Sequence, residues 1–201
     1  MKINKKDMLY ILKLAFILLV ISFVCTILLT VVNALTKTKI AERSQKSAQD
    51  ARIEVLKDAD DFKKTDGFKP NDKYGAPVNE IYIGTKDGKT AGYCVSVSPN
   101  GYGGAIQMIV GISADMNVTG VKITSMSETP GLGAKASDKS FTNQYIDKAA
   151  NGDLGVNKTG NASKDEINAI SGATISSKAV TSGVNAAAKA LSELMQKEGN
   201  Q

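Results

Sequence analysis

Hydroxyl groups gather in one short stretch near the C-terminus, just before a long amphipathic pattern: Ser171-Gly172-Ala173-Thr174-Ile175-Ser176-Ser177. Serine and threonine commonly stand at helix N-termini, where the first backbone N–H groups have no acceptor within the helix. Those N–H groups and the helix dipole also favour a phosphate group. The stretch therefore has two interpretations, a plain helix cap or the attachment point of a phosphate-bearing cofactor.

Two glycine-containing segments accompany this stretch. One is Gly101-Tyr102-Gly103-Gly104 and the other is Glu128-Thr129-Pro130-Gly131-Leu132-Gly133. Glycine permits tight turning and close approach of the backbone to a ligand. Proline fixes φ, so the second segment can be rigid and still lie flat against a planar ring. Taken alone, the first segment is consistent with a plain turn and the second with a connector between a strand and a helix. Neither is a dinucleotide-binding fingerprint.

Composition excludes several kinds of chemistry. The 201 residues include no histidine and two cysteines, Cys25 and Cys94, which are far apart. Histidine acid–base catalysis, histidine-containing metal sites and iron–sulfur patterns are therefore excluded, and we expect no metal. The net charge is +5, but the lysines are scattered among acidic residues and form no stripe with aromatic residues. We expect no nucleic-acid partner, and membrane lipid is the simpler one.

The segment 14–35 contains no charged residue and is long enough to cross a bilayer. It is preceded by a basic tail, residues 1–13, and lacks a convincing cleavage site. We predict an uncleaved single-pass anchor in the cytoplasmic membrane. The tail would lie in the cytoplasm and the remainder of the chain outside.

Residues 36–75 are predicted to connect the anchor to a domain, with a polar helix over 39–62 and a loop over 63–75. The domain, residues 76–201, begins with alternating apolar residues around 81–83 and 93–97, separated by the turn 86–89. Further strands are expected at 106–112 and 118–126. The fold class is α+β, a mixed and mostly antiparallel sheet covered by helices.

The C-terminal third is predicted to be mainly helical. We expect a short helix over 140–149, a polar loop over 152–160, a helical turn over 164–170 and a helix from Ser177 to about Lys197. Five apolar residues of that last helix share one face: Val180, Val184, Ala187, Leu191 and Leu194. Cys94 is predicted to be a buried strand residue.

The two distinctive blocks together resemble a known family. SETPGLGAKA at 127–136, followed by Phe141, and ISGATISSKAV at 170–180 are similar to blocks of the G subunit of the Rnf ion-translocating oxidoreductase. They occur in the order found in that family, and the N-terminal anchor matches too. The C subunit of the sodium-pumping NADH:quinone reductase shares the domain but is typically longer, so it is the second choice.

The resemblance implies that Thr174 carries FMN through a phosphoester bond. A flavin transferase would bring FAD, the Thr174 hydroxyl would attack the phosphorus nearer the riboflavin, and AMP would leave. Ser171, Gly172 and Ala173 complete the attachment motif, with Asn168 where an acidic residue is usual. The remaining expected FMN contacts fall into three groups. The backbone N–H groups of Ser176, Ser177 and Lys178 would hold the phosphate; the flavin ring would pack near Glu128, Thr129, Pro130, Gly131, Leu132 and Gly133; Tyr102 and Gly103 are weaker candidates.

The implied function is a membrane-anchored electron-transfer subunit in an Rnf-type complex. Such a complex couples electron flow between ferredoxin and NAD to Na⁺ or H⁺ translocation. The partners would be its other membrane and peripheral subunits, and the chain would have no independent catalysis. The alternatives are a stand-alone surface flavoprotein that passes electrons outward and a non-redox anchored binding module whose SGAT block only caps a helix.

Overall fold

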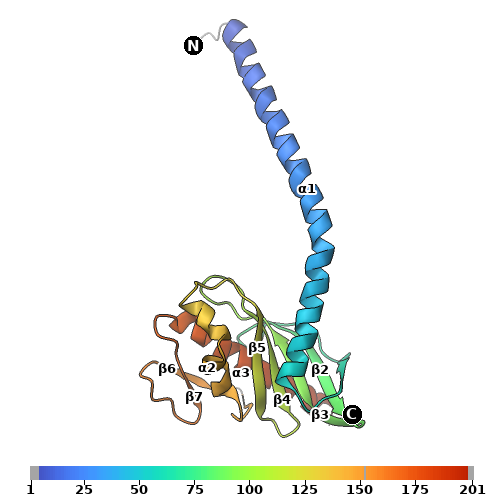
Figure 1. Cartoon of the computed structure of the whole chain (residues 1–201), viewed down its shortest axis with the longest axis vertical. Coiled ribbons are helices and arrows are strands. Elements are labelled where there is room, and N and C mark those ends of the chain that lie inside the picture. Colours follow the sequence, from blue (N-terminus) through green and yellow to red (C-terminus); the bar gives the residue numbers. More distant parts are fainter. Residues whose placement is uncertain (1–4, 152, 199–201) are drawn as a thin grey trace. The chain divides into compact units, whose positions relative to one another are not determined.

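The computed structural model describes residues 5–151 and 153–198. The chain divides into two compact units, Met1–Lys46 and Ser47–Gln201. The first unit consists of most of a single long helix, α1 (Lys5–Val55), whose course Figure 1 shows. Its apolar side chains are exposed along the predicted anchor, and by length and composition α1 can cross a membrane.

Helix α1 continues through the polar residues that follow the apolar segment. The expected polar helix over 39–62 is therefore not a separate element, and it ends at Val55 instead of Phe62. Continuity is physically reasonable because the segment after Leu35 is rich in Lys, Glu, Gln and Ala, which form helices readily. Two apolar residues near its end, Ala51 and Val55, are buried in the second unit.

The second unit is built on a five-stranded antiparallel sheet in the order β1-β2-β3-β4-β5. The strands are β1 (Asp61–Lys64), β2 (Val78–Lys86), β3 (Lys89–Val97), β4 (Gln107–Ser113) and β5 (Val118–Ser125). The predicted turn joins β2 to β3, with Asp87 and Gly88 at φ 51° and 76°, as a tight hairpin requires. The start of the predicted loop 63–75 is wrong, because Lys63 and Lys64 belong to β1.

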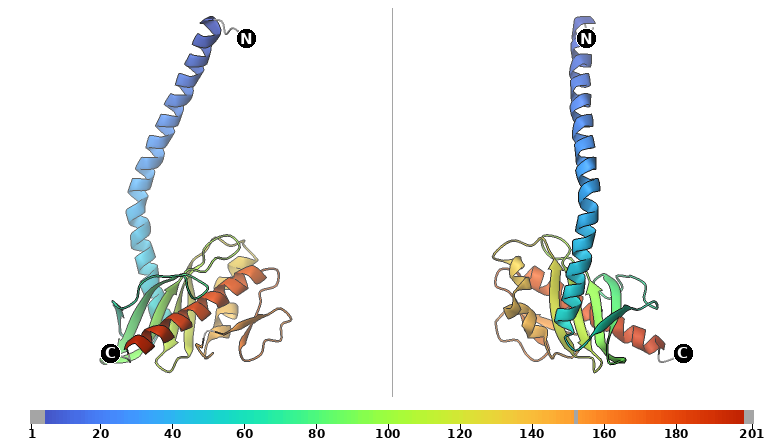
Figure 2. Two further views of the ribbon diagram at one scale, coloured as in Figure 1. Left: turned by 180° about the vertical axis from the view of Figure 1, so that it is seen from behind. Right: turned by 45° about the vertical axis from the view of Figure 1, so that its right-hand side comes forward.

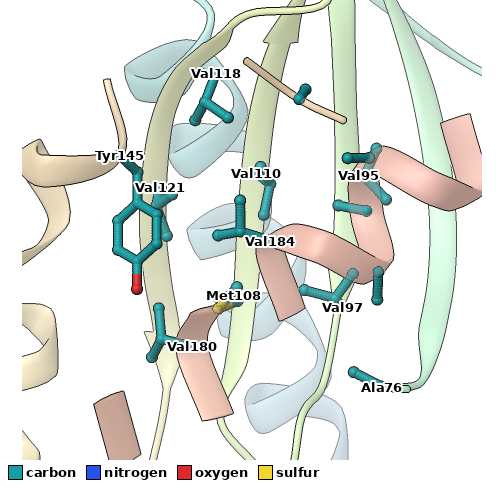
Figure 3. Close-up of a cluster of buried hydrophobic side chains, with 14 of the residues drawn as sticks. Ala76, Val95, Val97, Met108, Val110, Val118, Val121, Tyr145, Val180 and Val184 are labelled. Carbon is teal, nitrogen blue, oxygen red and sulfur yellow. The ribbon is translucent and has the colours of Figure 1, made fainter. Parts of the chain in front are cut away.

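Helices cover both faces of this sheet. Alternate residues of a strand point to opposite faces, so Val95 and Val97 face α3 (Thr174–Glu198), whereas Cys94 packs with the end of α1. Figure 2 shows α3 lying across the sheet. In Figure 3, Val180 and Val184 of this helix lie against the strand residues Val95, Val97, Met108 and Val110. The predicted apolar face of α3 and the buried position of Cys94 are confirmed.

Short elements link the sheet to α3. They are η1 (Gly133–Ser137), α2 (Lys139–Thr142), η2 (Asn143–Tyr145) and the parallel pair β6 (Gly155–Asn157) and β7 (Glu166–Asn168). The helix expected over 140–149 is therefore shorter than predicted and ends in a 3₁₀ turn.

The helical turn expected over 164–170 is wrong because β7 occupies part of it. The polar loop expected over 152–160, whose first residue lies outside the described residues, is interrupted by β6. The reason lies in polar side chains that bond to the nearby backbone. Asn157 Oδ1 accepts from Thr159 N–H at 2.7 Å, and Glu166 Oε2 accepts from Ser163 N–H at 2.9 Å. These bonds fold the segment into tight loops that bring β6 beside β7.

Candidate functional site

The two distinctive blocks of the sequence meet at one cleft. Its volume is about 560 Å³, which is within the usual range of small-molecule sites. Three chain segments enclose it. They are the glycine loop before β4 (residues 101–104), the Pro-Gly loop after β5 (residues 128–133) and the start of α3. The lining residues are Tyr102, Glu128, Thr129, Leu132, Gly133, Gly172, Ala173, Thr174, Ile175 and Ser176.

Most of the residues that the sequence predicted to contact the cofactor therefore line this cleft. Ile175 also lines the cleft, although sequence reasoning did not select it. Its only signal was its place between two motif hydroxyls. The other predicted residues flank the lining set without belonging to it: Gly103, Pro130, Gly131, Ser171, Ser177 and Lys178.

Helix α3 begins at Thr174, three residues before the predicted start at Ser177. The Ser177 N–H donates to Ala173 O at 3.0 Å and already belongs to the helix ladder. The buried Ser177 hydroxyl accepts from Ile170 N–H at 3.0 Å, so this serine supports the turn that leads into the helix. The Ser177 N–H therefore already has an acceptor within the protein, and the expected phosphate contacts of the Ser177 and Lys178 N–H groups stay predictions. The first-turn N–H groups, on Thr174, Ile175 and Ser176, have no acceptor within the helix.

The hydroxyls at the start of α3 differ in their accessibility. Ser176 is 1 % exposed and donates to Glu128 Oε2 at 2.6 Å. Ser177 is fully buried, and its hydroxyl donates to Ala173 O. Thr174 is half-buried and lines the cleft. Among the hydroxyls of the first helical turn, Thr174 is thus the one open to a reactant.

Glu128 connects the three segments of the cleft wall. Its side chain is buried, with 8 % of the residue exposed, and it accepts from Gly103 N–H at 3.0 Å as well as from Ser176. Burial alone would raise the pKa of this carboxyl. Hydrogen bonds from the Ser176 hydroxyl and from the Gly103 and Tyr102 N–H groups outweigh that effect and hold the pKa of Glu128 below its ordinary value. The carboxylate is therefore ionised at neutral pH.

Close packing around this carboxylate depends on Gly133. A Cβ there would collide with the Glu128 carboxylate and would lie 2.6 Å from Ser176 Oγ. Any side chain at this position would push the Pro-Gly loop away from α3. The glycine is thus needed for close approach within the protein wall, which is a reason that the sequence alone did not reveal.

The cleft also has an apolar rim. Three large side chains on it are well exposed: Tyr102 at 72 %, Leu132 at 44 % and Ile175 at 55 %. They line the same cleft as the start of α3, where the first-turn N–H groups have no acceptor within the helix. An apolar surface beside an anion-binding helix end fits a ligand with a planar ring and a phosphate. The exposed Lys178 lies one turn along α3, outside the cleft lining. Its role as a phosphate counter-charge stays a prediction.

Comparisons with known proteins agree with this geometry. Residues 101–189 match the FMN-binding domain, and residues 1–55 match the RnfG N-terminal region. The chain is 42 % identical over 183 residues to the G subunit of the Na⁺-translocating ferredoxin:NAD⁺ oxidoreductase complex of Acetobacterium woodii, covering 86 % of this chain and 87 % of the relative. It is 38 % identical over 165 residues to the G subunit of the proton-translocating ferredoxin:NAD⁺ oxidoreductase complex of Clostridium ljungdahlii, covering 82 % and 83 %.

A solved structure supports the fold. The C subunit of the Na⁺-translocating NADH-quinone reductase from Parabacteroides distasonis superposes with a TM-score of 0.57, covering 76 % of this chain and 94 % of that one. The two sequences are 19 % identical, so the likeness concerns the fold alone. The predicted α+β class, with an apolar N-terminal helix ahead of an antiparallel sheet domain, is confirmed.

Proposed function

Because this chain belongs to the G-subunit family of ion-translocating oxidoreductase complexes, we propose that it is the membrane-anchored electron carrier of such a complex, with FMN bound covalently through its phosphate to Thr174. Bound FMN would supply electron transfer, which the protein's own side chains cannot. The chain itself would bind, orient and shield that group. It would have no independent catalytic activity.

The observation that carries the proposal is the selective exposure of one hydroxyl at a helix start. Thr174 lines the cleft and is only half-buried, whereas Ser176, which also lines the cleft, and Ser177 are buried and donate their hydroxyl hydrogens to protein acceptors. A phosphate on Thr174 would lie beside the free N–H groups of the same helical turn, where the helix dipole favours negative charge.

The other cleft residues fit the rest of the cofactor. Tyr102, Leu132 and Ile175 offer exposed apolar surface to a flavin ring. Gly172, at φ 75°, turns the chain just before Thr174 and keeps bulk away from the attachment point. The flavin transferase would act on the folded domain, because the cleft is assembled from three separated segments.

The test is covalent flavin on a denaturing gel, with the full chain made in a host that has a flavin transferase. We expect a fluorescent band from the parent and from Ser176→Ala, and none from Thr174→Ala. Peptide mass spectrometry should find FMN on Thr174. FMN on Ser176, or on no residue of a folded parent protein, would refute the assignment.

The partners would be the membrane and peripheral subunits of the same complex. The relatives named above are described as sodium-translocating in one case and proton-translocating in the other, so we assign no coupling ion to this chain. Purification from native membranes should recover the chain together with multi-span subunits. Recovery of the flavinylated chain alone, under conditions that preserve membrane complexes, would instead support a stand-alone surface flavoprotein.

A further inference from the structure

We propose that Glu128 is a fixed negative charge in the wall of the cleft, which lowers the redox potential of a flavin bound there. This proposal rests on the proposed function, since it concerns the same site. It assigns to Glu128 a positioning and electrostatic role that is separate from attachment at Thr174.

The first argument is the composition of the cleft wall. Among the lining residues that the structure describes, Glu128 is the one acidic or basic side chain, and Tyr102 is the other titratable group. The cleft thus has no lining cation to offset a carboxylate. The nearby Lys178 is exposed and lies outside the lining set, where solvent screens it.

The second argument is that the carboxylate is fixed in place. Ser176 Oγ donates to Oε2 at 2.6 Å, and Gly103 N–H donates to Oε1 at 3.0 Å. Those donors come from α3 and from the glycine loop, so both carboxylate oxygens are held by separate elements. A charge with 8 % exposure is poorly screened by salt or water.

The sign of the effect follows from simple electrostatics. Reduction of a flavin adds negative charge unless protons compensate for it fully. A fixed carboxylate in the wall of the cleft that holds the flavin disfavours that added charge and so lowers the midpoint potential. Replacing Glu128 with the nearly isosteric Gln removes the charge but keeps an acceptor oxygen for Gly103 or Ser176.

The experiment measures flavin midpoint potentials of the full flavinylated chain in detergent at pH 6, 7 and 8. We compare the parent with Glu128→Gln and with a matched control, Glu54→Gln. Glu54 lies on α1, where it pairs with Lys122 at 2.6 Å, and it does not line the cleft. Mass spectrometry first establishes that each protein carries FMN on Thr174.

We expect Glu128→Gln to shift the potential to a more positive value, with the largest shift at pH 8, where protons compensate least for the added negative charge, and Glu54→Gln to leave the potential unchanged. A parent that carries no FMN would refute the proposed function itself. A loaded Glu128→Gln variant with the parent's potential would refute only the inference. A shift that is present at pH 6 and absent at pH 8 would also refute the inference, because a fixed carboxylate acts most strongly where protons compensate least.

A second variant keeps the proposal testable if Glu128→Gln does not accumulate. Ser176→Ala leaves the charge in place but removes one of its donors. Because fewer hydrogen bonds then offset the negative charge of Glu128, the flavin potential at pH 8 should become more negative than that of the parent. An unchanged potential in this variant would also overturn the proposal.

Discussion

Gly131 and Gly133 stand two residues apart in the Pro-Gly loop, yet they are required for different physical reasons. Gly131 has φ 78°, a conformation that L-residues rarely adopt, but a Cβ there would meet no heavy atom within 4 Å. At Gly133 the obstacle is the buried contact between Glu128 and Ser176. Strain at the first position is therefore local, whereas bulk at the second separates the cleft walls.

These two glycines give a residue-level prediction. Gly131→Ala should lower the free energy of unfolding by roughly 1–3 kcal/mol through backbone strain and leave FMN attached. Gly133→Ala should lower the fraction of chains that carry FMN, because the loop can no longer close on α3. Urea titration and the flavin-to-protein ratio measure the two effects. Equal flavin loading of both variants would contradict this distinction.

The sequence predicted some of the cleft residues but not the contacts between them. The prediction that Thr174 and the Pro-Gly loop serve one site came from the resemblance of the SGAT and ETPGLG blocks to the G-subunit family, since each block alone was open to a plain structural interpretation. The bond between Ser176 and Glu128 joins residues 48 positions apart, and no local pattern indicates it. The start of α3 was misplaced for a similar reason, since the hydrogen bonds of Ser177 to Ala173 and Ile170 leave no mark in a local pattern.

At the scale of elements, one carboxylate ties the loop before β2 to the last turns of α3. Glu193 accepts from Lys73 Nζ at 2.5 Å, from Tyr74 OH at 2.7 Å and from Lys197 Nζ at 2.7 Å. Hydrogen bonds from Lys197, Lys73 and Tyr74 lower the pKa of Glu193 from 4.5 to about 2. The Glu193 carboxylate therefore stays charged at a lower pH than an unperturbed glutamate would.

A lowered pKa in the folded protein predicts acid-sensitive stability. The stabilising contribution of Glu193 is fully present above its unfolded pKa near 4.5 and is lost as the pH falls toward 2. Glu193→Gln should reduce stability at pH 6 and flatten its decline between pH 5 and 3. Thermal unfolding across this range, with Glu54→Gln as the exposed control, measures the change. Parallel curves for the parent and Glu193→Gln would contradict the prediction.

Long elements with regular patterns were predicted from the sequence, and short polar ones were not. Alternating apolar residues marked β2, β3 and β5, a short apolar run marked β4, and one apolar face marked α3, so local patterns were sufficient. Strand β1 has four residues, Asp61–Lys64, and none of them is fully buried. Strands β6 and β7 have three residues each and pair in parallel across a loop. Side-chain bonds from Asn157 and Glu166 shape that loop, and hydrophobic periodicity cannot report such bonds.

At the scale of the whole molecule, a membrane anchor and a cofactor domain occupy one short chain. The apolar part of α1 is exposed along its length in the described residues and suits a bilayer, and the relatives are subunits of ion-translocating complexes. The chain is therefore membrane-anchored. The side on which the domain lies and the retention of the anchor remain predictions from the basic tail and the absence of a cleavage site.

Cysteine labelling tests that orientation, because the two natural thiols should not react with the label. Burial raises the pKa of the Cys94 thiol to about 12, and Cys25 lies within the apolar segment, so neither should react with a membrane-impermeant maleimide. A cysteine at the exposed loop position, Lys158→Cys, should be labelled in intact cells or spheroplasts. Lys5→Cys, in the N-terminal tail, should be labelled only after lysis. The reverse pattern would place the domain in the cytoplasm, and an N-terminus of the mature chain near Lys37 would show that the anchor is removed.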